Sequence, residues 1–165
     1  MSFPRCGRYN VYERVKQAFP ELTVLRQGDA PTTVLVERFK ADTRSVLLGT
    51  TSLWTGVDVP GEALTGLVID KLPFGSPDDP VALRISETDR TAFGSFTVPK
   101  SILTLRQGVG RLIRSQRDVG AVVILDRRLS TKGYGKRFVR SLPSMRRATS
   151  TAQIAPFLRA KGVQA

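Results

Sequence analysis

The sequence predicts an α/β fold, a mostly parallel β-sheet with helices on both faces. Short apolar runs alternate along the chain with stretches of helical spacing, a pattern typical of a parallel sheet covered by helices. The apolar runs are continuous, as expected for strands that are buried on both faces. A length of 165 residues suits one domain with room for a core.

The first half of the chain predicts two helices and two strands in alternation. Residues 9 to 19 and 31 to 40 place apolar side chains at helical spacing, whereas residues 22 to 26 suit a strand. The apolar run 46 to 48 predicts a second strand, which leads directly into Gly49, Thr50, Thr51 and Ser52. Because ligands bind at the carboxyl ends of strands in open α/β sheets, these four residues are candidates for binding.

The second half continues the alternation. Residues 67 to 70 and 121 to 125 predict strands, and Asp79-Pro80 is a typical helix start with an N-cap aspartate. Residues 101 to 117 predict a long helix. A last helix over 128 to 142 has a weak point at residues 133 to 135, and residues 143 to 165 are expected to form a poorly ordered end.

The predicted helix over 101 to 117 has two different faces. One face carries the apolar residues Ile102, Leu105, Val109, Leu112 and Ile113, which form a stripe for a core. At about 100° per residue, Gln107, Arg111 and Arg114 lie within about 60° of one another on the opposite face. Gly108 and Gly110 each cost about 1 kcal/mol relative to alanine, which makes sense if something must approach the backbone closely. The alternative is a solvated basic face with two incidental glycines.

A second motif follows the strand predicted at 46 to 48. After the hydroxyl residues, the segment up to residue 61 continues with Trp54, Gly56, Asp58, Pro60 and Gly61. Taken alone, this stretch is compatible with an ordinary strand–loop–helix turn in which Asp58 caps a helix.

Composition excludes several kinds of site. The chain has no histidine and a single cysteine, Cys6, so we expect no metal site, no disulfide framework and no iron–sulfur cluster. No apolar stretch approaches the length of a membrane span and no signal-peptide pattern opens the chain. The expected location is cytoplasmic, with no membrane partner.

Positive charge is concentrated in the last part of the sequence. Residues 1 to 99 hold 11 Lys and Arg against 12 Asp and Glu, a net charge of −1. Residues 100 to 165 hold 15 against 2, a net charge of +13. Such clustering is typical of polyanion binding. Part of the excess belongs to a loose basic end, which is expected to add non-specific, salt-sensitive affinity.

Together the two motifs resemble motifs V and VI of the DinG/XPD-like branch of superfamily 2 helicases. The first follows the pattern G-T-x-S-x-W-x-G-V-D-x-P-G and the second L-x-Q-G-x-G-R-x-I-R. Residues 69 to 80 and the strand with its D-x-R segment at 120 to 135 also resemble that branch, so the likeness covers residues 22 to 143. Thr55 departs from the pattern, since the family often has Glu or Gln there.

The resemblance implies roles for individual residues. Arg111 and Arg114 would reach the γ-phosphate of ATP, and Gln107 would orient phosphate or water. Gly110 would contact nucleotide, and Gly56 and Asp58 would contact nucleotide or link motif V to motif VI. Contacts to single-stranded DNA would come from Thr50, Thr51, Ser52 and Trp54, although Trp54 is equally compatible with a packed aromatic beneath the loop.

The chain carries only part of the expected machinery. It has no G-x-x-x-x-G-K-[ST] phosphate loop and no acidic box for magnesium. By the resemblance, ATP and Mg²⁺ would be held by a separate first RecA-like domain, acting in cis or in trans, and this chain would be the second. We expect a non-matching segment at 1–8, a RecA-like domain over 9–143 and a basic, poorly ordered tail over 144–165, in a chain that is a fragment. The interpretation is the second motor domain of an ATP-dependent 5′-to-3′ DNA helicase involved in DNA repair. The alternative is a non-catalytic basic module that binds nucleic acid.

Overall fold

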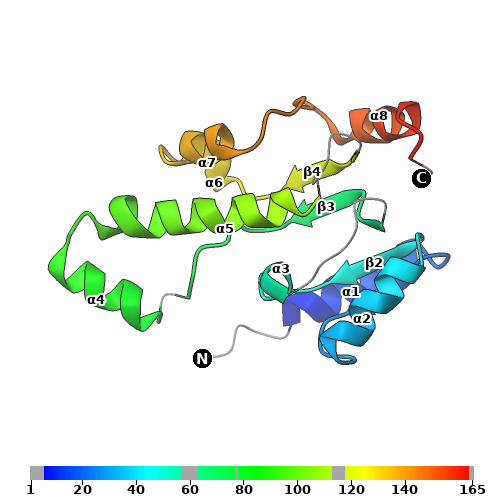
Figure 1. Cartoon of the computed structure of the whole chain (residues 1–165), viewed down its shortest axis with the longest axis horizontal. Coiled ribbons are helices and arrows are strands. Elements are labelled where there is room, and N and C mark those ends of the chain that lie inside the picture. Colours follow the sequence, from blue (N-terminus) through cyan, green and yellow to red (C-terminus); the bar gives the residue numbers. More distant parts are fainter. Residues whose placement is uncertain (1–5, 57–62, 77, 113–117, 164–165) are drawn as a thin grey trace. The chain divides into compact units, whose positions relative to one another are not determined.

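The computed structural model describes residues 6 to 56, 63 to 76, 78 to 112 and 118 to 163 (Figure 1). The chain divides into two compact units, residues 1 to 63 and residues 64 to 165. Each unit combines helices with one pair of parallel strands. The predicted α/β class with parallel strands is therefore confirmed. The predicted boundaries at residues 8/9 and 143/144 stay predictions.

The first unit is a small α/β arrangement. Its elements are α1 (Cys6–Ala18), β1 (Thr23–Arg26), α2 (Thr32–Ala41), β2 (Ser45–Leu48) and the single turn α3 (Leu53–Gly56). Strands β1 and β2 are parallel, with Thr23 opposite Ser45 and Arg26 opposite Leu48. Helix α1 contacts β1, and α2 contacts both strands. The buried apolar residues of this unit are Leu25, Leu35, Val36, Phe39 and Leu53.

The second unit repeats this plan with more helices. It contains β3 (Gly66–Ile69), α4 (Pro80–Thr88), the π-helical turn η2 (Phe93–Thr97), α5 (Val98–Gly110) and β4 (Ala121–Ile124). It ends with α6 (Arg128–Thr131), α7 (Gly135–Ser141), the 3₁₀ turn η3 (Thr151–Gln153) and α8 (Ile154–Ala160). Strands β3 and β4 are parallel, with Gly66 opposite Ala121 and Ile69 opposite Ile124.

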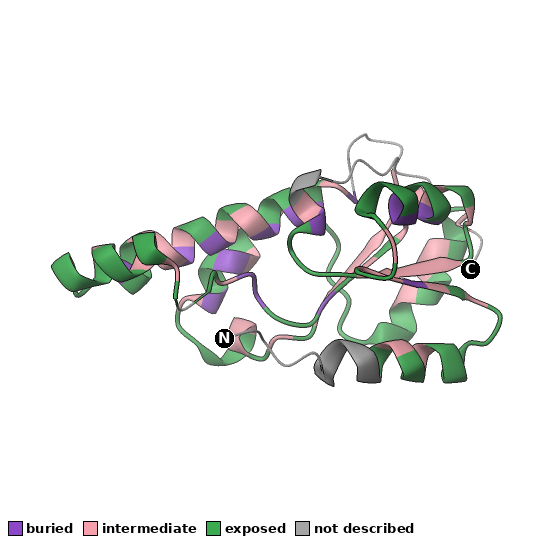
Figure 2. Ribbon diagram, turned by 90° about the horizontal axis from the view of Figure 1, so that it is seen from below, coloured by how far each residue is buried: buried purple, intermediate pink, exposed green. Residues whose placement is uncertain are grey.

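Helix α5 supplies more of the described core of the second unit than any other element, with Val98, Leu105 and Val109 all buried. Three residues of the predicted apolar stripe are buried, with Leu105 and Val109 fully covered and Leu112 covered just beyond the helix end, whereas Ile102 is half-buried. The helix contacts η2 and α7, which supplies the fully buried Phe138. Figure 2 shows how buried and exposed residues alternate along the helices of the chain.

The helix predicted over 101 to 117 has different limits. It begins at Val98, with Pro99 in its first turn, and its last helical residue is Gly110. Proline is favourable in a first turn because its φ is preset, and the two glycines near the end weaken further propagation. Gly108 therefore lies inside the helix, whereas Gly110 ends it. The predicted residues Ile113 and Arg114 lie outside the described residues.

Two local predictions in the second unit are confirmed. Asp79 caps α4, since its Oδ1 accepts a hydrogen bond from the Val81 N–H at 3.0 Å and Pro80 follows at the first helical position. The helix predicted over 128 to 142 is interrupted as expected, because α6 ends at Thr131 and α7 begins at Gly135. A Cβ on Gly135 would overlap the backbone of Leu129, so glycine is required there. The pattern did not predict α8.

Candidate functional sites

The loop after β2 brings together the hydroxyl residues of the first predicted motif. Its backbone turns at once into α3, because the N–H groups of Leu53 and Trp54 bond to the carbonyls of Thr50 and Thr51 at 3.0 and 2.9 Å. Thr50, Thr51 and Ser52 are exposed, and the buried Leu53 anchors the turn. A Cβ on Gly49 would overlap the Leu53 side chain, which accounts for a glycine at the end of the strand.

Gln27 organises this loop, although sequence reasoning did not single it out. Its Oε1 accepts hydrogen bonds from the Thr50 N–H at 2.9 Å and from the Thr50 hydroxyl at 3.0 Å. Its Nε2 donates to the Ser52 Oγ at 2.9 Å, and the two hydroxyl oxygens lie 2.8 Å apart. The available signal was positional: Gln27 follows β1 as Gly49 follows β2, and parallel strands end at the same edge of a sheet.

The remaining residues of the first motif are only partly described. Trp54 lies in α3 and is half-buried, which is compatible with both roles considered for it. Gly56 is the last residue of α3. Asp58 lies outside the described residues.

The second motif lies at the carboxyl end of α5. Gln107 and Gly110 are exposed, whereas Gly108 between them is buried. Arg111 follows the helix with helical backbone angles, and its N–H bonds to the Gly108 carbonyl at 3.3 Å. Arg111 is half-exposed and its Nε is buried, so its guanidinium is held against the protein. Of the predicted arginine pair, the structure therefore describes Arg111, and Arg114 falls outside.

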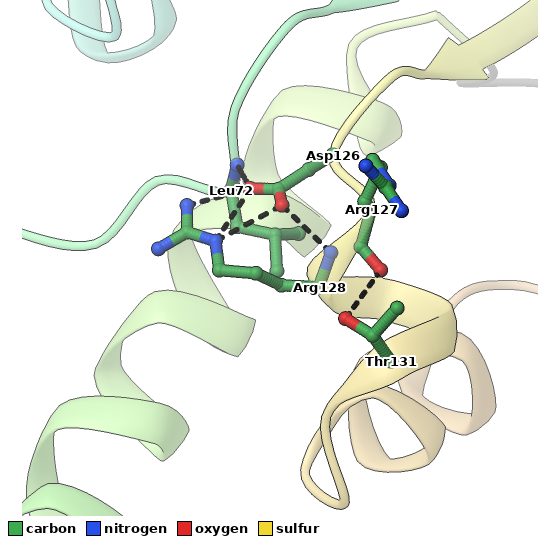
Figure 3. A network of polar contacts seen from close by, with 5 residues as sticks. All are labelled: Leu72, Asp126, Arg127, Arg128 and Thr131. Atoms are coloured by element: carbon green, nitrogen blue, oxygen red, sulfur yellow. Dashed lines mark hydrogen bonds and ion pairs between the residues drawn. The ribbon is translucent and has the colours of Figure 1, made fainter.

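An ionic network connects the ends of β3 and β4 with the start of α6 (Figure 3). The Asp126 carboxylate accepts a hydrogen bond from the Leu72 N–H at 2.8 Å and from the Arg128 N–H at 2.9 Å. The Arg128 guanidinium binds both carboxylate oxygens, with contacts between 2.6 and 3.0 Å. It also lies 4.8 Å from the centre of the Phe74 ring, in cation–π geometry.

Hydrogen bonding outweighs burial in setting the pKa of Asp126. The Asp126 side chain is only 6% exposed. Hydrogen bonds from Arg128, and then from the Leu72 backbone, hold the pKa of that carboxyl well below its ordinary value, against the opposing effect of burial. The same contact raises the pKa of Arg128. Asp126 and Arg128 are the two ends of the D-x-R segment noted in the sequence. Their contacts join the ends of β3 and β4 to the start of α6.

The described part of the chain contains no group of three or more histidine, cysteine or acidic residues placed to hold a metal ion. None of its described helices is long and apolar enough to cross a membrane.

Comparison with known proteins places the chain in a family. Residues 8–145 match the helicase C-terminal domain family. The chain is 40% identical over 166 residues to the ATP-dependent DNA helicase YoaA of Haemophilus influenzae, covering 96% of this chain and 26% of that protein. It is 45% identical over 140 residues to the ATP-dependent helicase DinG of Mycobacterium tuberculosis, covering 82% of this chain and 21% of that protein.

A third relative carries a different name. The chain is 45% identical over 114 residues to the 3′-5′ exonuclease DinG of Bacillus subtilis, covering 67% of this chain and 12% of that protein. The chain thus spans about a quarter or less of the length of these relatives. The family match and the relatives agree with the resemblance carried by the two motifs, and the chain therefore belongs to the helicase C-terminal domain family, with the DinG- and YoaA-type helicases as relatives.

Proposed function

We propose that the chain acts as the second motor domain of an ATP-dependent 5′-to-3′ DNA helicase. In this role it supplies Arg111 and Arg114 to ATP bound by a first RecA-like domain, and it contacts single-stranded DNA through the loop after β2. Magnesium ligands and the phosphate loop would come from that first domain. The proposed polarity rests on the resemblance to the DinG/XPD-like branch.

The observation that carries the proposal is the anchoring of the carboxyl end of α5. Leu105 and Val109 fix one face of the helix in the core, while Gln107 remains exposed and Arg111 half-exposed just beyond it. A guanidinium suits stabilisation of transferring phosphate because its charge is permanent and its donors form a planar fork. Phosphoryl transfer depends mainly on such positioning, and one arginine can contribute about 10³ to 10⁵ in kcat.

Small exposed hydroxyls suit the proposed DNA contact. Phosphate contacts carry no sequence information, so short polar side chains such as those of Thr50, Thr51 and Ser52 serve a motor that moves along any sequence. Trp54, which is half-buried next to them, would stack on a base in the same proposal.

The test compares two arginines of the same region. Arg111→Ala, in the chain supplied with the first motor domain of a relative in cis or in trans, should lower DNA-stimulated ATPase activity by orders of magnitude. Arg106→Ala is the matched control, because Arg106 is exposed on α5 and has no proposed role. Arg111→Lys should rescue poorly, since an ammonium lacks the fork. The chain alone should release no phosphate from ATP. Near-normal turnover by Arg111→Ala and Arg114→Ala would refute the arginine assignment.

The charge distribution supports a second candidate, a non-catalytic basic module that binds nucleic acid. Residues 100 to 165 carry a net charge of +13, which favours salt-sensitive binding to any polyanion. This candidate predicts that Arg111→Ala and Arg106→Ala lower DNA affinity by similar, modest factors and that neither affects ATP turnover. Steady-state ATPase and DNA binding on the same preparations separate the two candidates.

A further inference from the structure

In the loop after β2, Thr50 and Ser52 both form hydrogen bonds with Gln27, which the proposed DNA contact does not by itself explain. We propose that Gln27 is a positioning residue that presents the Ser52 hydroxyl, rather than the Thr50 hydroxyl, to a phosphodiester oxygen of single-stranded DNA. This inference rests on the proposed function and adds the residue that controls the contact.

The donors and acceptors of the loop determine which hydroxyl can be redirected. Gln27 Oε1 accepts both the backbone N–H and the hydroxyl of Thr50, so the single hydroxyl hydrogen of Thr50 is directed toward Gln27. At the 2.8 Å contact between the two hydroxyls, Thr50 can then offer only a lone pair, and Ser52 is the partner with a hydrogen to donate.

Ser52 can turn its hydrogen outward without losing its position. Its oxygen accepts from Gln27 Nε2 at 2.9 Å, and this bond persists when the hydroxyl hydrogen rotates toward a phosphate. The bond formed to phosphate is charge-assisted and about twice as strong as a neutral one. Redirecting the Thr50 hydroxyl would instead break a bond to the oxygen that also holds the Thr50 backbone.

Only an amide side chain can both accept hydrogen bonds from Thr50 and donate one to Ser52. The carbonyl end of Gln27 holds Thr50, while its amino end, which cannot accept a hydrogen bond, keeps the Ser52 oxygen as an acceptor. Gly49 makes room for this contact, since a Cβ there would lie 3.2 Å from Gln27 Oε1 as well as overlapping Leu53. All three hydrogen-bonding side chains lie where a ligand can reach them, because these bonds are solvent-exposed.

The test replaces the side-chain amino group of Gln27 and keeps its carbonyl oxygen. Gln27→Glu keeps the acceptor for Thr50 but replaces the amino group with an oxygen, which draws the Ser52 hydrogen inward and repels phosphate. Gln17→Glu, on the exposed surface of α1, is the control for the same change of charge. Affinity of the full chain for a labelled oligo-dT is measured by anisotropy over a range of salt concentrations.

We expect Gln27→Glu to weaken binding about tenfold more than Gln17→Glu, the effect of one hydrogen bond to a charged group. A purely structural role for Gln27 predicts the same penalty whether or not Ser52 keeps its hydroxyl. Unlabelled ATP should not displace the oligonucleotide, which distinguishes a phosphodiester from a nucleotide phosphate.

Ser52→Ala separates this inference from the proposed function. If the alanine variant binds DNA as tightly as the wild type, the proposed contact of this loop is wrong, and the inference falls with it. If Ser52→Ala weakens binding, the double variant with the neutral Gln27→Met decides, because Gln27→Met should then cost nothing further in the alanine background. A penalty that persists in that background would overturn the role of Gln27 while leaving the DNA contact in place.

Hydrogen exchange of the Thr50 amide checks the geometry independently of DNA. Gln27→Glu should keep this amide protected, because its acceptor remains, whereas the neutral Gln27→Met should expose it. Gln27→Met also provides a second binding measurement without added charge, and a wild-type affinity for this variant would overturn the proposal.

Discussion

The two units of the chain use the same backbone contact with different chemistry. In the first unit Gln27, which follows β1, accepts the N–H of Thr50, which follows β2. In the second unit Asp126, which follows β4, accepts the N–H of Leu72, which lies just beyond β3. The first contact is neutral and exposed. The second belongs to a nearly buried carboxylate that also binds Arg128.

This difference parallels the charge of the units. Residues 1 to 63 hold 8 Lys and Arg against 7 Asp and Glu, a net charge of +1, whereas residues 64 to 165 hold 18 against 7, a net charge of +11. A neutral contact can exchange partners at little cost, while breaking a buried charged one leaves an uncompensated group. The comparison indicates that the Asp126 contact costs more to break than the Gln27 contact and contributes more to holding the fold.

Asp126→Asn is expected to have the largest effect on stability. The substitution leaves the Arg128 guanidinium without its carboxylate and should lower the free energy of unfolding by about 2 to 3 kcal/mol, with some relief because Arg128 is partly solvated. Asp29→Asn is the control, since it removes the more exposed pair with Arg26 and should cost less than about 1 kcal/mol. Urea denaturation measures both, and equal losses would contradict the distinction between a holding contact and a surface pair.

Gly135→Ala tests how tightly the second unit is packed at its backbone. The added methyl would overlap the Leu129 backbone, which cannot rotate away, so we expect a loss of about 1 to 3 kcal/mol, as for overpacking in cores. Gly133→Ala, two residues earlier, meets no atom of the described residues and should change stability by less than about 0.5 kcal/mol. Thermal denaturation of the two variants would refute this contrast if their midpoints were alike.

Acid should weaken the charged contact and leave the neutral one unaffected. The pKa of Asp126 is lower in the folded chain than its ordinary value of 3.8, so its contribution to stability is present above that value. The contribution is lost as the pH falls from about 4 toward the folded pKa. The stability difference between the wild type and Asp126→Asn should therefore be constant from pH 7 to pH 5 and narrow below pH 4. Urea midpoints across that range provide the measurement. A stability difference that widens in acid would contradict the lowered pKa of Asp126.

Gly110→Ala is expected to have a small, stabilising effect on the fold. Gly110 ends α5, is exposed, and would bring its Cβ near no atom of the described residues. Alanine should therefore stabilise the isolated chain by up to about 1 kcal/mol. In a reconstituted motor the same substitution should lower ATPase activity, because the proposed nucleotide approaches this backbone. A variant that is stabilised and fully active would show that the glycine has no role in approach.

Local patterns predicted most of the elements. The apolar runs at 46 to 48 and 121 to 125 are β2 and β4 within one residue, and Asp79-Pro80 starts α4 as its capping chemistry requires. The limits of α5 were less accurate, because apolar periodicity continues past Gly110 although the helix does not. Periodicity reports which face is buried, whereas backbone propensity decides where the helix ends.

The candidate sites were predicted only where their chemistry is local. The hydroxyls of the loop after β2 follow a strand in sequence, so their position was foreseeable. The role of Gln27 was not foreseeable. Its hydrogen-bond partners Thr50 and Ser52 lie 23 and 25 residues away, and the pairing of two strands brings them near. Asp126 and Leu72 are 54 residues apart, and nothing in the composition of either segment indicates that they meet.

The shared contact at the strand ends also has a mechanical meaning. A force that peels β2 from β1 at their carboxyl ends must break the Gln27–Thr50 contact before it reaches the Gln27–Leu48 backbone bond. A force that peels β3 from β4 at the same ends must first break the Leu72–Asp126 contact, which Arg128 reinforces. Each strand pair thus has a side-chain contact that closes the end where ligands bind in α/β sheets. The charged contact in the second unit should break at the higher force.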